Sequence, residues 1–294
     1  MAGICVALPA DGIIAALQAS DDFTVSSVKG NPGAGVRKAV ELLGGMGRFV
    51  KKGQAVVIKP NIGFPVPPEM GATVSPEVVA ETARMCVEAG AERIYILENP
   101  LRTPEVCLKI SGIYDACRKI ERTNLFGVTD KSQFQAMDVP KGIELKKTSV
   151  MKDILKKDTV IINIATAKSH GATTVSLCLK NLMGTILDRK TFHRDMNIHQ
   201  AIADLATIVK CDLNIIDATR AMVTGGPAGP GRLEMPGTIL AGSNIVCVDA
   251  VGVTIAKWYG KSYSPQDIKH IVLAEKHGLG PADLKKIKII EAKV

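Results

Sequence analysis

The residues best suited to chemistry are concentrated between positions 165 and 199. This stretch begins where a strongly apolar segment ends, and it combines three of the five histidines with lysines, an arginine and an amide. The residues concerned are Lys168, His170, Lys180, Asn181, Arg189, His193 and His199. Cationic groups, imidazoles and an amide gathered together are what an anionic ligand or a metal ion requires. The stretch therefore indicates a binding site more clearly than it indicates a reaction.

Proton transfer in this region is expected from three residues, His170, Lys180 and His199. Lys180 lies beside apolar residues such as Leu179, and such surroundings lower the pKa of a lysine, which can then donate a proton or react with a carbonyl group. His199 lies in the first turn of a predicted helix, where the helix dipole favours a neutral imidazole. The alternatives stay open: a structural His170, a Lys180 that reaches water and a His199 that faces solvent.

Other polar residues follow the ends of predicted strands. Lys59 and Asn61 come after one strand, Glu98 after another, and Asp217 ends a third. In parallel α/β sheets ligands bind beyond the carboxyl ends of the strands. We therefore expect these groups to meet Lys168 at one edge of a sheet.

Two kinds of site are expected from these residues. An anionic ligand is expected to bind four side chains and the backbone of a glycine-rich loop, namely Lys59, Asn61, Lys168, Asn181, Gly225 and Gly226. A divalent metal ion or metal-containing cofactor is the second expectation, because imidazole groups bind zinc, iron and nickel. Its expected ligands are His170, His193, His199 and Asp217. A plain turn is the alternative for the glycine-rich loop, which lacks a nucleotide-binding fingerprint.

The composition of the 294-residue chain favours a globular protein with anionic partners. The net charge is +8, and the hydrophobic share of 46% is ordinary for a soluble protein. Aromatic residues make up 4%, too few for a platform that stacks single-stranded nucleic acid, so nucleic acid is not an expected partner. No apolar run approaches the roughly 18 residues of a membrane span, and residues 1–11 lack the pattern of a secretion signal.

The cysteines are scattered rather than clustered. Seven are present and none forms a Cys-x-x-Cys pair, which predicts reduced thiols in a cytoplasmic protein. The same spacing lacks the local signature of structural zinc or of an iron–sulfur cluster. The sequence leaves the oligomeric state open, with a homo-oligomer among the alternatives.

Strands and helices alternate along the chain. This order predicts an α/β fold with a mixed, mostly parallel sheet and helices on both faces. One domain over residues 1–294 is expected, with a peripheral subdomain around 100–157. Strands are predicted at 54–58, 93–97, 143–146, 158–164, 213–217, 237–241 and 287–292. Helices are predicted at 76–90, 175–183, 245–259 and 265–277, as two short helices within 101–120, and after a cap at Asn197.

This pattern also places several side chains. Lys168 and His170 are expected in the loop between the strand 158–164 and the next helix. Asp249 lies in an apolar helix, so its carboxylate must be hydrogen-bonded or face a cavity. His270 and His277 lie on the last predicted helix and are expected to face solvent.

Several ordered motifs run from about Val56 to Val251. They include Ile58-Lys-Pro-Asn61, Ala167-Lys-Ser-His170, Leu179-Lys-Asn-Leu-Met-Gly184, Ile216-Asp-Ala218 and Gly225-Gly-Pro227. Together they resemble the domain-of-unknown-function family 362. The resemblance implies an association with iron–sulfur proteins, because many members carry an added ferredoxin segment with clustered cysteines. This chain has no such segment, so a resident iron–sulfur cluster is not expected.

A second resemblance concerns the order of three residues. His170, Lys180 and a later histidine follow one another as in the cofactor region of lactate racemase-like proteins. The later histidine is His193 or His199. Those proteins hold a nickel pincer nucleotide, so the resemblance implies a nickel-containing cofactor. An analogy of this kind does not fix the function.

Two functional hypotheses follow. The first is a cytoplasmic enzyme acting on a small anionic substrate, with the class of metal- or cofactor-dependent oxidoreductase or isomerase left open. The alternative is a non-catalytic partner of a redox system that docks ferredoxin-like proteins through a basic surface. Binding to a nucleic-acid backbone has only the positive charge in its favour, and no nucleic-acid motif accompanies it.

Overall fold

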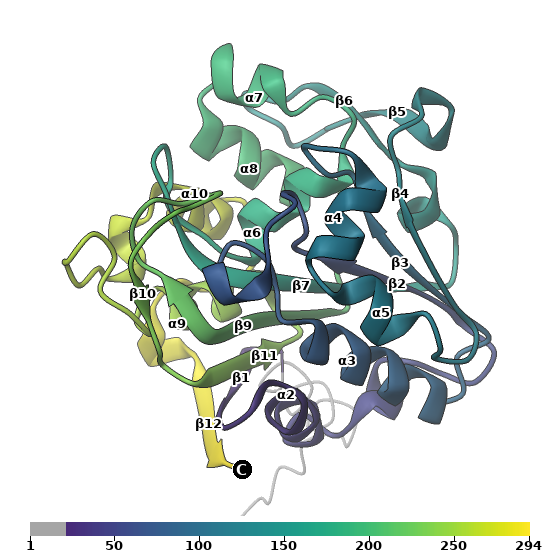
Figure 1. Cartoon of the computed structure of the whole chain (residues 1–294). Helices are drawn as coiled ribbons and strands as arrows, with labels where there is room; N and C mark the ends of the chain where they lie inside the picture. The colour runs from purple at the N-terminus through teal and green to yellow at the C-terminus, as the bar shows by residue number, and fades with distance from the viewer. Residues whose placement is uncertain (1–21) are drawn as a thin grey trace, which may run out of the picture.

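The computed structural model describes residues 22–294. Cys5 and the segment 1–11, which the sequence predicts not to be a secretion signal, lie outside the described residues. The described chain forms a ten-stranded sheet and a separate two-stranded sheet (Figure 1). The large sheet is mixed and mostly parallel, which confirms the predicted α/β class.

Eight strands of the large sheet lie side by side, and two short strands extend it. The order is β12 (Lys288–Lys293), β1 (Thr24–Lys29), β11 (Thr238–Gly242), β9 (Leu213–Met222), β7 (Thr159–His170), β2 (Ala55–Pro60), β3 (Arg93–Glu98) and β4 (Thr123–Gly127). The short strands are β8 (Thr174–Ser176), paired with β7, and β10 (Leu233–Glu234), paired with β9. Strands β9, β7, β2, β3 and β4 are mutually parallel, so their carboxyl ends share one edge.

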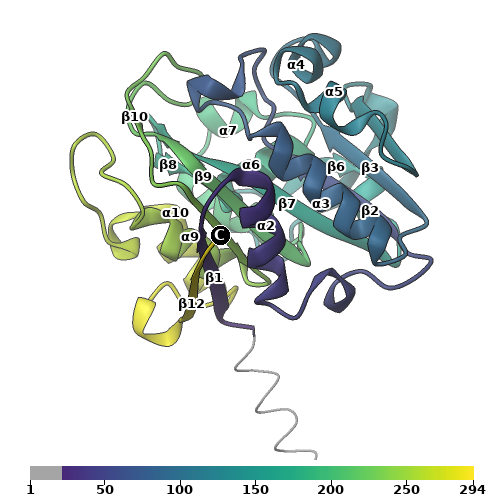
Figure 2. The ribbon, with the colours of Figure 1, turned by 60° about the horizontal axis from the view of Figure 1, so that its bottom comes forward.

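Helices cover both faces of this sheet, as predicted (Figures 1 and 2). The first face carries α2 (Pro32–Glu41), α3 (Pro76–Glu88), α4 (Pro104–Ile110) and α5 (Ile113–Cys117). The second face carries α6 (Cys178–Asn181), α7 (Lys190–Arg194), α8 (Ile198–Ala206), α9 (Ile245–Val253) and α10 (Lys269–Lys276). Successive strand residues alternate between the two resulting cores: Ile215 packs with the first face and Ile216 with the second. Burial on both sides explains why these strands are continuously apolar in sequence.

Strand β7 is longer than predicted, which changes the place of two site residues. It continues through Lys168 and His170, which pair with Ser176 and Thr174 of β8 in an antiparallel hairpin. The expectation that both residues lie in a loop is therefore wrong. The predicted helix at 175–183 is wrong at its start for the same reason, because β8 occupies its first residues.

Asp249 determines where α6 begins. Its carboxylate accepts hydrogen bonds from the backbone N–H groups of Cys178 at 2.7 Å and Leu179 at 2.9 Å. These donors have no partner within a helix, so the carboxylate satisfies the start of α6. The expectation that Asp249 is hydrogen-bonded is confirmed, and burial raises its pKa to about 7. A 3₁₀ turn, Leu182–Thr185, follows α6.

The predicted strand at 143–146 is wrong. The small sheet consists of β5 (Phe134–Asp138) and β6 (Lys147–Met151), and residues 143–145 instead bind a side chain. Asp204 Oδ2 on α8 accepts backbone N–H groups from Ile143, Glu144 and Leu145 at 2.7–2.9 Å. The carboxylate of Asp204 thus binds the backbone N–H groups that would pair with a neighbouring strand if residues 143–145 formed one. Strand β4, which falls within residues 100–157, lies at one edge of the large sheet. The peripheral subdomain around 100–157 stays a prediction.

Helices α9 and α10 are shorter than predicted, and neither His270 of α10 nor His277, the residue that follows it, is exposed. Helix α9 ends at Val253, whose carbonyl accepts a hydrogen bond from Trp258 Nε1 at 2.8 Å. His270 is fully buried, and His277 Nε2 lies 2.7 Å from Asp204 Oδ1. The expectation that both histidines face solvent is wrong, because α10 packs along α8. Within the described residues, no helix is both long enough and apolar enough to cross a bilayer.

Candidate functional site

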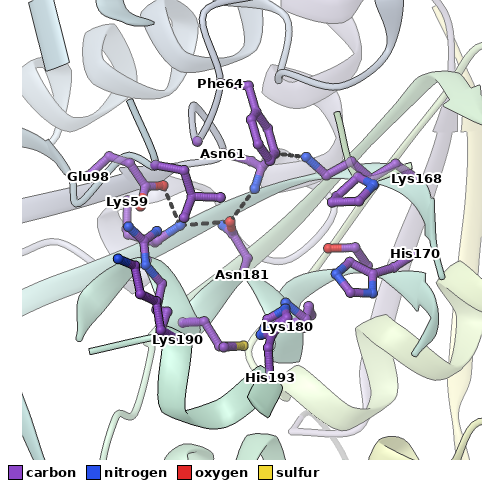
Figure 3. A pocket seen from close by; sticks show the side chains of 17 residues that line it. Lys59, Asn61, Phe64, Glu98, Lys168, His170, Lys180, Asn181, Lys190 and His193 are labelled. Atoms are coloured by element: carbon purple, nitrogen blue, oxygen red, sulfur yellow. Dashed lines mark hydrogen bonds and ion pairs between the residues drawn. The ribbon is translucent and has the colours of Figure 1, made fainter. Parts of the chain in front are cut away.

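A cavity of about 280 Å³ lies at the carboxyl ends of β2, β3 and β7 (Figure 3). The structure brings most of the predicted site residues to its wall, namely Lys59, Asn61, Lys168, His170, Lys180, Asn181 and His193. Further lining residues that matter below are Phe64, Glu98, Gly184, Arg189 and Lys190. Segments far apart in the sequence therefore meet at one edge of the sheet.

A row of hydrogen bonds crosses the floor of this cavity. Lys59 Nζ donates to Glu98 Oε2 and Asn181 Oδ1, each at 2.7 Å. It also donates to Pro60 O at 3.1 Å, so all three of its N–H groups have partners. Asn61 Nδ2 donates to the same Asn181 oxygen at 2.7 Å, which continues the row (Figure 3). Lys59 thus holds the floor together, which differs from the direct anion contact expected for it.

Asn181 is also fully occupied by protein groups. Its Nδ2 donates to Asn163 Oδ1 at 2.8 Å and to Ile164 O at 3.2 Å, while its oxygen accepts from Lys59 and Asn61. An amide with both ends bonded has little left for a ligand. We therefore assign Asn181 to positioning the floor instead of the expected contact with an anion.

Glu98 carries the carboxylate of this floor, and no role was predicted for it beyond its place after a strand. Burial raises the pKa of Glu98 and lowers the pKa of its partner Lys59, while the attraction between the two opposes both shifts. Its second oxygen, Oε1, is buried and makes no hydrogen bond of ordinary length within the described chain. A side chain in place of Gly184 would overlap Glu98 Oε1 and Lys59 Nζ, so this ion pair would have to shift to admit it.

Lys168 keeps part of its hydrogen-bonding capacity. Its Nζ donates to Asn61 Oδ1 at 2.7 Å and to Ala72 O at 2.6 Å, which leaves one N–H group. The same nitrogen lies 5.6 Å from the centre of the Phe64 ring, within the range of a cation–π contact. Burial, together with the nearby charge of Lys180, lowers the pKa of Lys168 to about 7.

Lys180 differs from the other two buried lysines. Its Nζ makes no hydrogen bond and no ion pair with any residue that the structure describes, and Figure 3 shows it apart from the floor. The residue is 9% exposed. Burial, followed by the charges of Arg189 and Lys59, lowers the pKa of Lys180 to about 7. The direction agrees with the lowering predicted from its apolar neighbours.

His170 is held as one tautomer. Its Nδ1 accepts a hydrogen bond from Ala172 N at 3.2 Å, so Nε2 carries the hydrogen. Burial, and then the charge of Lys180, lowers the pKa of His170 to about 3, so the ring is neutral at neutral pH. The His193 ring lies 5.7 Å away, edge to face. This tautomer favours donation of a hydrogen bond to a ligand oxygen over the predicted role as a base.

Four predicted site residues lie away from the cavity wall. His199 stacks on His270 with ring centres 5.9 Å apart. Asp217 accepts hydrogen bonds from Ser75 N at 2.8 Å and from Thr219 N at 3.0 Å. Gly225 and Gly226 also fall outside the wall: Gly226 N donates to Ser169 Oγ at 3.1 Å, although the next residue, Pro227, lines the cavity. Backbone donation by this loop to an anion is therefore not supported.

The predicted metal ligands do not converge. Of the expected set, His170 and His193 face the cavity, whereas His199 and Asp217 are engaged elsewhere. Within residues 22–294 no group of three or more histidine, cysteine, aspartate or glutamate side chains is placed to hold a metal ion. The residues at the cavity that match the lactate racemase-like order are His170, Lys180 and His193, which supply two imidazoles. The described residues thus do not fit the expected ligand set.

Residues 56–254 match the family model described as "Domain of unknown function (DUF362)". The chain belongs to this family. The thylakoid-associated protein sll1697 of Synechocystis sp. is 27% identical over 266 residues, which cover 84% of this chain and 75% of that protein. A crystal structure of a Thermotoga maritima protein is similar over 64% of this chain, with a TM-score of 0.44 and 15% identity. This chain spans about half of that protein, 51% of its length.

The cavity of this DUF362 protein lies entirely within the matched segment, and it is strongly cationic. Among the described residues that line it, five are lysine or arginine and one, Glu98, carries a carboxylate. The cations are Lys59, Lys168, Lys180, Arg189 and Lys190. Lys59, Lys168 and Lys180 are buried, and of these only Lys59 has a carboxylate partner within the described chain. Buried cations without such a partner destabilise one another, and an anion placed between them relieves that repulsion. The arrangement is therefore suited to an anionic ligand.

Proposed function

We propose that this protein is an enzyme that acts on a small anionic substrate bound in the cavity. The observation that carries the proposal is that five lysine or arginine side chains and one carboxylate lie among the described lining residues. A cavity of about 280 Å³ corresponds to roughly nine water-sized volumes, so the part of the substrate that it encloses has on the order of ten non-hydrogen atoms.

The side chains divide into two roles. Lys180, Arg189 and the remaining N–H group of Lys168 bind the anionic group, because these donors are not all used by the protein. The floor formed by Lys59, Glu98, Asn181 and Asn61 holds those donors in place. The Nε2–H of the neutral His170 ring donates to an oxygen of the substrate on which negative charge develops.

Proton transfer is the chemistry that these groups support. A general acid–base group works best when its pKa lies near the operating pH. Lys168 and Lys180, with pKa values of about 7, meet that condition. Of the two reaction classes expected from the sequence, isomerisation by proton transfer is the one that the chain's own residues serve.

A ligand screen tests the proposal. The full chain is mixed with panels of small carboxylates and phosphates, and its thermal midpoint is measured. A ligand at about 100 times its Kd stabilises the fold by about 2.7 kcal/mol, which raises the midpoint of a chain of this size by about 5 °C. The His170→Ala/Lys180→Ala double variant is expected to lose this response. Lys119→Ala removes the same charge from an exposed turn and should keep it. An unchanged response in the folded double variant would refute the proposal.

The redox-partner role and the cytoplasmic location, both expected from the sequence, stay predictions. A non-catalytic role in docking ferredoxin-like proteins predicts an association that weakens steeply as salt is added. A cytoplasmic location has the support of six described cysteines that are free thiols. The thylakoid association in the relative's name belongs to that relative.

A further inference from the structure

We propose that Lys180 is a nucleophile that forms an imine with a small 2-oxo carboxylic acid bound in the cavity. The inference rests on the proposed function, because the carboxylate of such a substrate is to be held by Arg189 and Lys168, while Lys180 reacts in its unprotonated form. It adds the substrate class and a covalent step at one named atom.

The first support is the state of the Lys180 amine compared with the other buried lysines. Lys59 uses three N–H groups for protein partners and Lys168 uses two. The Lys180 amine has no hydrogen-bond partner and no carboxylate among the described residues, yet it lies on the cavity wall. A buried amine with these surroundings has its lone pair available for reaction.

The second support is the charge around Lys180. Arg189 and Lys59 both disfavour a further positive charge at this position, and burial acts in the same direction. A lysine desolvated next to other cations is a recognised way to obtain a neutral amine nucleophile near neutral pH. About half of the Lys180 side chains are unprotonated at pH 7 when the pKa is about 7.

The third support is the rigidity of the element that carries Lys180. Two residues before it, the N–H of Cys178 is anchored on Asp249, as is the N–H of Leu179. Directly after it, Asn181 is fixed by hydrogen bonds from and to the floor. The backbone of Lys180 is therefore held on both sides, which limits the amine to positions at the cavity wall.

The neighbouring groups suit both ends of a 2-oxo acid. Arg189 presents a planar guanidinium, which matches the geometry of a carboxylate, and only one of its N–H groups is bonded to Pro100 O. His170 supplies a neutral N–H donor for the carbonyl oxygen. The cavity accommodates a molecule on the order of ten non-hydrogen atoms, which leaves room for the smaller 2-oxo acids.

The covalent step balances without an oxidant or reductant. Lys180 Nζ attacks the carbonyl carbon, a C–N bond forms, and the carbonyl oxygen takes up a proton to give a carbinolamine. The C–O bond then breaks and the oxygen leaves as water, with one hydrogen coming from the amine and a second proton coming from solvent. The product is a protonated imine on Lys180, which withdraws electrons from the neighbouring carbon.

Trapping by reduction tests the proposal. The full chain is incubated with pyruvate or glyoxylate and sodium cyanoborohydride near neutral pH, and the modified peptides are identified by mass spectrometry. Surface lysines have a pKa of about 10.4, so roughly one in 10³ is neutral near pH 7.4, and the yield at Lys180 should exceed theirs by more than about tenfold. Lys180→Arg should abolish that adduct, whereas Lys119→Ala should keep it.

A competition experiment uses only the unaltered chain, so it does not depend on the folding of a variant. Propionate carries a carboxylate without a carbonyl group, and it should reduce the yield at Lys180 without affecting surface lysines. No enriched adduct at Lys180, or one that propionate does not reduce, would overturn the imine proposal. Thermal stabilisation by propionate in the absence of any adduct would leave the proposed anion site standing. Absence of both, together with no thermal response to the carboxylate and phosphate panels, would remove the proposed function as well.

Discussion

Lys168 and Lys180 make the charge of the cavity depend on pH in the neutral range. Both have a pKa of about 7, well below that of an exposed lysine, because they are buried and close to other cations. As the pH rises through 7, each loses its charge while Arg189 keeps its own. The strength of anion binding therefore depends on two side chains that are ordinarily insensitive to pH in this range.

We predict that affinity for a carboxylate such as propionate is highest below about pH 7 and falls by up to about tenfold per unit for each lysine above it. The bound anion raises the lysine pKa values, so the fall begins somewhat above 7. Stability of the ligand-free chain should change in the opposite direction. Between about pH 7 and 10 the unfolded chain binds more protons at these two lysines than the folded chain does. The contribution of the two lysines to stability therefore rises with pH.

Titration calorimetry between about pH 6 and 9 checks the affinity, since propionate keeps a constant charge in that range. Lys180→Ala should bind more weakly and show a flatter profile. A profile of constant affinity in the unaltered protein would contradict the assigned pKa values of the two lysines.

Asn181 is the residue on which the floor of the cavity depends. Replacing it by alanine removes the acceptor for Lys59 and Asn61 and leaves Asn163 Oδ1 and Ile164 O without their donor. Unsatisfied buried groups cost about 1–3 kcal/mol each, so we expect Asn181→Ala to lower the free energy of unfolding by about 2–4 kcal/mol. Urea denaturation measures this, with the exposed Asn124→Ala as a control that should change it by less than about 0.5 kcal/mol.

At the scale of elements, the hairpin of β7 and β8 and the short helix α6 decide the site. The hairpin places Lys168 and His170 on a strand, and α6 begins only at Cys178 because Asp249 binds its first N–H groups. Hydrophobic periodicity predicts a helix over 175–183. It cannot place the start of α6, because that start depends on the carboxylate of Asp249, 71 residues away in the chain. Because such contacts join residues far apart in the chain, local patterns predict the type of an element better than its first and last residues.

Asp204 joins α8 to the loop at 143–145 and to α10. It accepts three backbone N–H groups on one oxygen, while Gln200 and His277 contact the other. We predict that Asp204→Ala lowers the free energy of unfolding by about 3 kcal/mol, because several donors lose a charged acceptor. It should also speed hydrogen exchange at the N–H of Leu145.

Asp138→Ala is the matched control for this variant. That side chain is 74% exposed and lies 3.4 Å from Lys147, and exposed pairs of this kind contribute little. Equal losses of stability in the two variants would show that the Asp204 network does not hold the loop and the two helices together.

At the scale of the whole molecule, one sheet buried on both faces collects the site at a single edge. The parallel strands β9, β7, β2 and β3 all end on the same side, and Lys59, Glu98 and Lys168 come from three of them. The net charge of +8 describes the molecule as a whole, whereas the cavity concentrates positive charge at one place. Positive groups gathered in a small cavity attract an anionic ligand more strongly than the same groups spread over the surface.

The sequence by itself determined the α/β class, the main strands and the meeting of Asn61, His170 and Lys180 at one sheet edge, because these follow from local periodicity and parallel topology. Tertiary structure alone decided which groups are free. In the folded chain Lys59 and Asn181 are hydrogen-bonded to protein groups, and Asp217 accepts a hydrogen bond from Ser75. His270 is buried. Hydrogen-bond partners and burial depend on packing between segments distant in sequence, and no local pattern of residues records them.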